Sequence, residues 1–151
     1  MTSRRALFAL ASALVLDGCA AGPPAPAVLT LTVHAGADQN PDPSGHAAPV
    51  AFQLFQLSGT GSFDRADFFA LVEHKEQTLG TDLLGSEQFV LPPGQTKTIT
   101  RTLQKGTQFV GIAVLFRDID HATWRLTAPV AASGPSALTL TISGLKATLA
   151  S

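Results

Sequence analysis

Residues 108–117 read QFVGIAVLFR, a nearly continuous apolar run that follows the turn signal Lys105-Gly106 and precedes a polar segment. A strand with one solvent-facing side alternates apolar and polar residues. A short run that is apolar throughout, rich in β-branched and aromatic residues, is typical of a strand covered on both faces. The run therefore predicts a central β-strand, and it favours a fold in which sheets are layered.

Short segments with strand character lie on both sides of this run and are separated by clusters of Gly, Pro, Asn, Asp and Ser. In residues 50–57, Phe52 and Leu54 share one face while Phe55 and Leu57 fall on the other, which indicates a β-bulge or a strand covered on both sides. Seven or eight such strands at turn spacings of about 8–12 residues predict an all-β, two-sheet β-sandwich. The further strands expected are residues 28–34, 87–91, 97–103, 123–130, 137–143 and 145–149.

One segment after the second strand has helical spacing instead. In residues 64–72 (DRADFFALV), Phe68, Leu71 and Val72 stand at i, i+3 and i+4. Ser62 or Asp64 is expected to cap its start, and residues 73–77 predict a second short helix. We therefore expect a short helical insertion that covers one end or edge of the sandwich.

The N-terminus has the pattern of a secretory signal. Residues 1–5 are positively charged, and residues 6–16 (ALFALASALVL) are apolar or small but too few to span a membrane, which needs about 20 residues. The signal ends in Leu16-Asp17-Gly18-Cys19, which resembles the lipobox of bacterial lipoproteins although Asp17 departs from the small residue usual there. The alternative is an ordinary signal peptide with an incidental cysteine.

The lipobox interpretation predicts three parts of the chain. Residues 1–18 are a cleaved signal peptide, residues 19–27 are a lipidated cysteine with a Pro/Ala tether, and residues 28–151 are the β-sandwich domain. Cys19 is the only cysteine, so it forms no disulfide within the chain, and we expect it to carry a diacylglycerol and an N-acyl lipid. By resemblance to enterobacterial sorting rules, Ala20 after the cysteine favours the periplasmic face of the outer membrane.

Composition argues against several classes of function. Without Arg4, Arg5 and Asp17 the chain has eight basic and ten acidic residues, a net charge of −2 with no run of one sign, so we expect no nucleic-acid partner. The segment SGTGS at 58–62 lacks the lysine of a phosphate-binding loop, and no nucleophile elbow is present. The sequence predicts no enzyme, no catalytic residues and no cofactor other than the lipid.

Three weaker candidates remain. Asp118, Asp120 and His121 are the best candidates for a metal or acid–base site, although a polar turn between two strands is the favoured interpretation. The aromatic cluster Phe63, Phe68 and Phe69 is more typical of a helix docked on a sheet than of a ligand cradle. Residues 35–49 (AGADQNPDPSGHAAP) have no periodicity, and a connection of this length inside a compact domain is usually functional or disordered.

Several strings in order resemble a known family. They are NPDPSG at 40–45, FQLFQL at 52–57, FDRADFFAL at 63–71, TLGTDLL at 78–84, FVLPPG at 89–94, FRD at 116–118 and WR at 124–125. Behind a lipobox, this set is similar to the outer-membrane lipoprotein of the type VI secretion system, the TssJ/VasD/SciN family, over about residues 28–149.

The resemblance implies a transthyretin-like sandwich of two four-stranded sheets, no enzymatic activity, and one protein partner. That partner is the periplasmic C-terminal domain of the inner-membrane protein TssM, contacted through the loop between the first two strands, here residues 35–49. The alternative is a small-ligand carrier, since transthyretin-like sandwiches can hold ligands in an apolar cavity. The residues expected to bind the partner are Asp38, Gln39, Asn40, Pro41, Asp42, Pro43, Ser44, Gly45 and His46.

Overall fold

The computed structural model describes residues 22–151. The predicted signal peptide and Cys19 lie outside the described residues. Within residues 22–151, no helix has the length and apolar character needed to cross a membrane.

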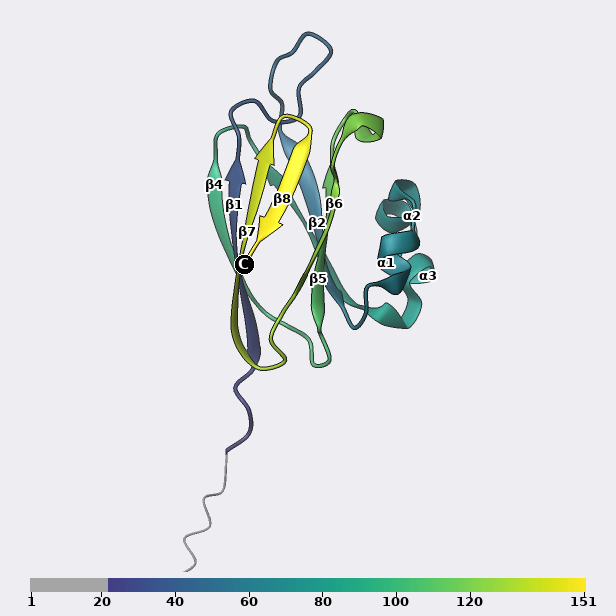
Figure 1. Cartoon of the computed structure of the whole chain (residues 1–151), viewed down its shortest axis with the longest axis vertical. Helices are drawn as coiled ribbons and strands as arrows, with labels where there is room; N and C mark the ends of the chain where they lie inside the picture. The colour runs from purple at the N-terminus through teal and green to yellow at the C-terminus, as the bar shows by residue number, and fades with distance from the viewer. Residues whose placement is uncertain (1–21) are drawn as a thin grey trace, which may run out of the picture.

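In the described residues, eight strands form two four-stranded sheets packed face to face, which confirms the predicted sandwich (Figure 1). The first sheet has the order β4-β1-β7-β8 and the second the order β3-β2-β5-β6. The strands are β1 (Ala27–Ala35), β2 (Val50–Leu57), β3 (Leu83–Leu91), β4 (Thr96–Thr102), β5 (Phe109–Leu115), β6 (Arg125–Pro129), β7 (Gly134–Ser143) and β8 (Lys146–Ala150).

Strand direction alternates along the chain. β1 runs antiparallel to β4 and parallel to β7, while β2 runs antiparallel to both β3 and β5. The connections that follow β1, β5 and β7 therefore lie at the same end of the sandwich, at the top of Figure 1. The chain enters β1 from the opposite end, where residues 22–26 leave the domain at the bottom of the figure.

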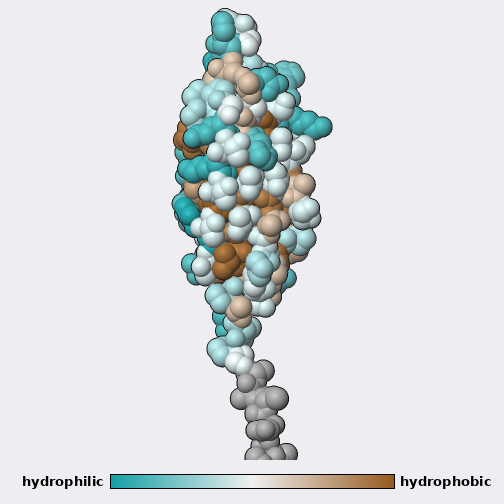
Figure 2. Space-filling view, turned by 90° about the vertical axis from the view of Figure 1, so that its left-hand side faces the viewer, coloured by the Kyte–Doolittle hydropathy of each residue, from teal (hydrophilic) through white to brown (hydrophobic). Residues whose placement is uncertain are grey.

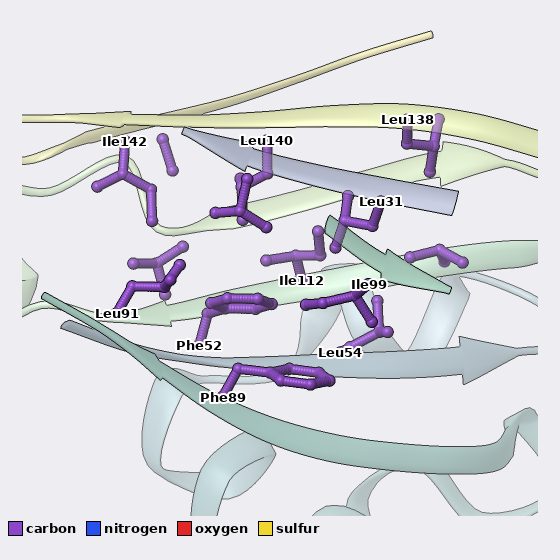
Figure 3. Packing of buried hydrophobic residues seen from close by; sticks show 14 of the residues in the cluster. Leu31, Phe52, Leu54, Phe89, Leu91, Ile99, Ile112, Leu138, Leu140 and Ile142 are labelled. Atoms are coloured by element: carbon purple, nitrogen blue, oxygen red, sulfur yellow. The ribbon is translucent and has the colours of Figure 1, made fainter. Parts of the chain in front are cut away.

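Aliphatic and aromatic side chains from both sheets fill the space between them (Figure 3). Leu31 and Leu140 of the first sheet and Phe52 and Ile112 of the second are fully buried. Phe52 also stacks on Phe89, with 5.2 Å between ring centroids. In residues 22–151, these side chains thus occupy the middle of the sandwich, where a small-ligand carrier would need an apolar cavity.

The central strands of the second sheet are covered on both faces, as the apolar run predicted. Phe52 and Leu54 of β2 face the inter-sheet core, whereas Phe55 and Leu57 join a second cluster beneath the helices. The register of the β2–β3 pairing also shifts between Gln56 and Leu57, where Leu84 of β3 is skipped. The change of face along β2 thus reflects a second apolar layer, and the irregular register is confined to the end of the strand.

The helical insertion consists of α1 (Gly61–Arg65), α2 (Phe68–Glu73), α3 (Lys75–Leu79) and the 3₁₀ turn η1 (Gly80–Asp82). The prediction of one helix over 64–72 was wrong, because Ala66 adopts an extended conformation and ends α1. Asp67 caps the next helix through a 2.7 Å hydrogen bond from the Ala70 N–H to its Oδ1 atom, a role that the sequence reading gave to Ser62 or Asp64.

Arg125 of β6 attaches this insertion to the second sheet. Its guanidinium lies over the Trp124 ring at 4.5 Å and donates hydrogen bonds to the backbone oxygens of Phe63, Asp64 and Ala66. These carbonyls lie at the C-terminal end of α1, where a cation also interacts favourably with the helix dipole. Phe68 of α2 adds an edge-to-face contact on Trp124 at 5.1 Å.

Arg125→Ala is expected to loosen the insertion without unfolding the sandwich. The variant leaves three carbonyls without their charged donor, so we expect the free energy of unfolding to fall by about 2 kcal/mol. Amide hydrogen exchange over residues 61–79 should become markedly faster than in the parent. Arg65→Ala, which removes an exposed arginine of the same insertion, should leave both measurements close to the parent values; equal effects of the two variants would contradict this role.

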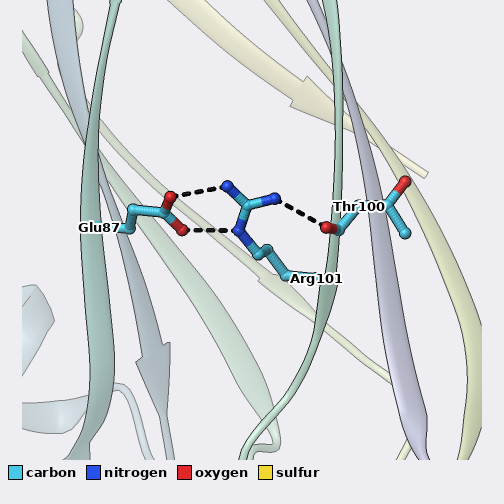
Figure 4. A network of polar contacts seen from close by, with 3 residues as sticks. All are labelled: Glu87, Thr100 and Arg101. Atoms are coloured by element: carbon cyan, nitrogen blue, oxygen red, sulfur yellow. Dashed lines mark hydrogen bonds and ion pairs between the residues drawn. The ribbon is translucent and has the colours of Figure 1, made fainter.

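The edge strands β3 and β4 belong to different sheets and are joined by an ion pair (Figure 4). Arg101 donates from Nε and Nη2 to the two carboxylate oxygens of Glu87, at 2.8 and 2.7 Å, and from Nη1 to the Thr100 carbonyl. The hydrogen bond from Arg101 lowers the pKa of Glu87, although partial burial acts in the opposite direction. The pair bridges the open side between the two sheets.

This ion pair predicts a pH-dependent effect of Arg101→Ala. Because the pKa of Glu87 is lowered on folding, its contribution to stability is present above the unfolded pKa, near 4.3, and is lost as the pH falls through the lowered value. Urea denaturation should show a small loss of stability at pH 7 that disappears at strongly acidic pH. Lys105→Ala at another exposed cation should show no such pH dependence; a constant Arg101→Ala effect across this range would argue against the pair.

Candidate partner-binding site

The loop between β1 and β2 is an ordered structure with a base that is tied to the sandwich and a projecting tip. At the base, the Gly36 N–H donates to the Ile142 carbonyl at 2.7 Å. The N–H of Ala48, on the returning limb, donates to the Gln39 carbonyl at 3.1 Å. The two limbs of the loop are thus held together close to the sheet.

Gln39 and Asn40 lie inside this base rather than on its surface. They are 0% and 3% exposed, respectively. Gln39 Nε2 donates to the Leu91 carbonyl at 2.9 Å and to the Ala48 carbonyl at 3.3 Å. The expectation that these two side chains supply polar contacts on the surface is therefore corrected, because both are buried and their amide nitrogens donate to carbonyls of the loop and the sandwich.

The tip is a small hairpin organised by Asp42. The Asp42 N–H donates to the His46 carbonyl at 2.8 Å, and its Oδ1 atom accepts from the N–H groups of Ser44 and His46, each at 2.9 Å. Gly45 has a φ of 85°, which favours glycine at this turn. Pro43, Ser44, Gly45 and His46 are exposed, with the His46 side chain 81% accessible. Hydrophilic residues predominate at this end of the molecule (Figure 2).

Asp38 lies beside the base and is exposed. The Ser143 hydroxyl, at the end of β7, donates to both of its carboxylate oxygens at 3.2–3.3 Å. Of the nine residues expected to bind a partner, the surface therefore presents Asp38 and the tip residues Pro43, Ser44, Gly45 and His46, with Pro41 and Asp42 half-buried beneath them.

A hollow of about 430 Å³ lies next to the tip. Besides Pro41, Asp42 and Pro43, it is lined by Arg117 and Asp118 from the β5–β6 connection and by Leu145 from the β7–β8 turn. These last three residues were not among those predicted to bind a partner. The alternation of strand direction is the signal that identifies them, because it brings these connections to the end that holds the loop.

Asp118, Asp120 and His121 form a polar turn, in which Ile119–His121 is a 3₁₀ turn (η2) rather than an extended strand end. His121 Nδ1 lies 2.8 Å from Asp118 Oδ1, and this hydrogen bond, with the Asp118 charge, raises the pKa of His121. In the part of the chain that the structure describes, three or more His, Cys, Asp or Glu side chains do not gather at any metal-binding position.

The aromatic cluster separates into two environments. Phe63 is fully buried against Phe55, and Phe68 packs on Trp124, so both dock the insertion on the second sheet as predicted. Phe69 is 61% exposed and touches Phe68 edge to face. The three rings therefore do not line a common ligand cradle.

Sequence comparison agrees with the architecture. Residues 27–145 match the family described as type VI secretion lipoprotein, VasD, EvfM, TssJ. The chain belongs to this type VI secretion lipoprotein family. It is accordingly a membrane-bound structural lipoprotein of the type VI secretion system. No curated protein matches the chain significantly.

Solved structures of type VI secretion lipoproteins have the same fold. The chain is similar to the lipoprotein TssJ1 from Pseudomonas aeruginosa, with 35% identity, a TM-score of 0.79, and coverage of 85% of this chain and 96% of that one. Serratia marcescens Lip shares the fold at 24% identity and a TM-score of 0.75, over 83% and 97% of the two chains. A chain of a structure described as a type VI membrane complex has 27% identity and a TM-score of 0.74, over 82% and 98%.

A further similar chain belongs to a structure from EAEC described as the T6SS protein TssM C-terminal domain. The identity is 26% and the TM-score is 0.69, with coverage of 82% of this chain and 98% of that one.

Proposed function

We propose that this lipoprotein tethers the periplasmic C-terminal domain of TssM to the outer membrane, with the lipid on Cys19 as anchor and the β1–β2 loop as the partner-binding element. Its family membership supports a structural role in secretion, and the similar chain in the structure named for TssM supports that partner. The observation that carries the proposal is the position of the loop at the end of the sandwich opposite the tether (Figure 1).

The loop and the tether lie at opposite ends because strand β1 joins them. β1 begins at Ala27, next to the tether, and ends at Ala35, where the loop starts. Eight residue steps at about 3.3 Å each separate them by roughly 26 Å. A lipid at Cys19 thus places the loop on the side of the domain that faces away from the membrane.

The tether is shorter than the composition suggested. The Gly134 N–H donates to the carbonyls of Ala25 and Pro26 at 3.3 and 3.2 Å, and the Leu103 N–H donates to the Ala27 carbonyl at 2.8 Å. Residues from Ala25 onward are therefore held by the domain. The six steps from Cys19 to Ala25 reach at most roughly 20 Å, so the domain stays close to the lipid surface.

The competing function, a small-ligand carrier, has no support in the interior, because side chains fill the space between the sheets. Hollows of about 430 and 390 Å³ lie at the loop end and at the tether end of the domain, respectively. Neither is lined by the side chains at the middle of the core.

The proposal is tested by blocking each end of the domain with the same substitution. Ser44→Trp places a large ring on the exposed tip, and Ser133→Trp places it on the exposed β6–β7 turn at the tether end. Full-length protein in detergent is titrated with the soluble C-terminal domain of TssM. Ser44→Trp should weaken binding at least about 10-fold, the range expected for a residue at the centre of an interface, whereas Ser133→Trp should bind like the parent. Equal affinity of Ser44→Trp and parent would exclude the loop as the binding element.

A further inference from the structure

Asn40 connects three segments that are far apart in the sequence. Its N–H donates to the Gly144 carbonyl in the β7–β8 turn, and its Nδ2 donates to the Pro49 carbonyl on the returning limb of the loop, each at 2.9 Å. Its Oδ1 accepts from the Arg117 N–H, after β5, also at 2.9 Å. Asn40 is buried and has a φ of 48°, a left-handed conformation that asparagine tolerates better than most residues.

The segments joined by Asn40 are the walls of the hollow at the loop end. Pro41 follows Asn40 directly, and the Arg117 N–H donates to Asn40 Oδ1. Leu145 follows Gly144, whose carbonyl accepts from the Asn40 N–H. A change at Asn40 therefore alters the relative positions of all three walls. The hollow is a composite structure, and the loop alone does not form it.

The lining of the hollow combines apolar walls with acidic groups. Pro41, Pro43 and Leu145 are apolar, and the charged residues of the lining are Asp42, Asp118 and Arg117. Each carboxylate also has a histidine beside it outside the lining, His46 for Asp42 and His121 for Asp118. Each carboxylate keeps capacity to accept hydrogen bonds. Asp42 and Asp118 accept hydrogen bonds through their Oδ1 atoms, and Asp42 Oδ2 lies 3.6 Å from His46 Nδ1. Asp118 Oδ2 has no hydrogen-bond partner among the described residues.

This combination fits the side chain of an arginine. The methylene stem of such a side chain packs on apolar walls, while its guanidinium donates to carboxylates. An acidic side chain would instead meet two carboxylates and one guanidinium. Arginine fits better than lysine because its planar group carries five donors, enough to bond several acceptors together.

We propose that the hollow walled by Pro41–Pro43, Arg117–Asp118 and Leu145 receives an arginine side chain of the protein partner, and that Asn40 is the positioning residue that assembles it. The proposal rests on the proposed function for the identity of the partner. It adds the chemistry of recognition and extends the binding surface beyond the β1–β2 loop.

The charge of the hollow is tested by isosteric substitution. D42N and D118N keep an oxygen acceptor at the loop and turn but remove both negative charges. Full-length protein in detergent, titrated with the soluble C-terminal domain of TssM, should bind about 30-fold more weakly in the double variant, with a shallower dependence on salt. R117Q should bind at least as tightly as the parent. Parental affinity of D42N/D118N, or weaker binding of R117Q alone, would overturn the proposal.

The role of Asn40 is tested by measuring whether the effect of D42N/D118N on binding depends on Asn40. If Asn40 acts by positioning the carboxylates, the D42N/D118N pair should weaken binding about 30-fold in the parent but only a few-fold in an N40A background. A full effect of the pair in N40A would reduce Asn40 to a structural residue and overturn its assignment. Arg125→Ala provides a control because it loosens the helical insertion on the second sheet. It should leave unchanged both the affinity for the TssM domain and the effect of D42N/D118N on that affinity.

These measurements separate the two proposals. If the parent binds and D42N/D118N binds equally well, the arginine site fails while the tethering function stands. If the parent protein does not bind the TssM domain, both fail.

Discussion

Replacing Cys19 by serine is expected to move the protein from the membrane fraction to the aqueous fraction. In the proposed lipidation, the thiolate of Cys19 takes up the diacylglyceryl group; a serine hydroxyl does not replace it, so we expect the variant to carry no acyl chain. One 14-carbon chain alone gives a membrane association constant of about 10⁴ M⁻¹, and further chains multiply it. Partition into membranes should therefore fall by more than about 10⁴-fold, as measured by fractionation and by incorporation of labelled palmitate.

Asp17→Gly provides the matched control for this experiment. It restores a small residue before Gly18 and leaves Cys19 intact, so palmitate incorporation should equal or exceed that of the parent. The sandwich of the Cys19→Ser protein should keep its thermal stability, since the core lies entirely within the described domain. Palmitate entering Cys19→Ser as efficiently as the parent would rule out Cys19 as the anchor.

Deleting residues 37–45 is expected to destabilise the domain strongly, in addition to abolishing binding. The deletion removes Gln39 and Asn40, which leaves the Leu91 carbonyl and the Arg117 N–H without their partners. Each buried polar group left unpaired costs about 1–3 kcal/mol, so we expect a loss of about 3–5 kcal/mol and a Tm lower by roughly 10 °C or more. If the whole loop were a surface appendage, as its composition suggests, the deletion would change the stability very little.

A shortened tip separates binding from stability. Replacing residues 42–46 (DPSGH) by Asn-Gly, which favours a two-residue hairpin turn, keeps Gln39 and Asn40 in place. Calorimetry should give a Tm within a few degrees of the parent, while binding of the TssM domain is lost. A parental Tm for the 37–45 deletion would refute the structural role of the loop base, and parental binding by the shortened tip would move the interface elsewhere.

The β-strands were predictable because their residues alternate, or remain apolar, over their own length. The second strand was predicted with its observed bounds, and β5 lies inside the apolar run at 108–117. β3 begins at Leu83, four residues before the predicted start, because Leu83 to Ser86 have no alternation and become a strand by pairing with β2. The local sequence pattern thus predicts that a strand is present more reliably than it predicts where the strand begins and ends.

The loop base was not predictable in the same way. Gln39 and Asn40 stand among prolines, glycines and aspartates, a composition typical of an exposed connection. Their burial depends on acceptors and donors at Leu91, Arg117 and Gly144, which only the packed sandwich brings within hydrogen-bonding distance. The hollow beside the tip was missed for the same reason.

By itself, the sequence determined the class of the fold, the approximate number of strands, the unusual loop and the family to which the chain belongs. These properties depend on periodicity and on ordered local strings, which are present in the chain before it folds. Tertiary structure alone decided which loop residues face the solvent and which connections share an end of the sandwich. Burial and proximity are determined by pairing between segments distant in sequence, such as the contact of Asn40 with Arg117.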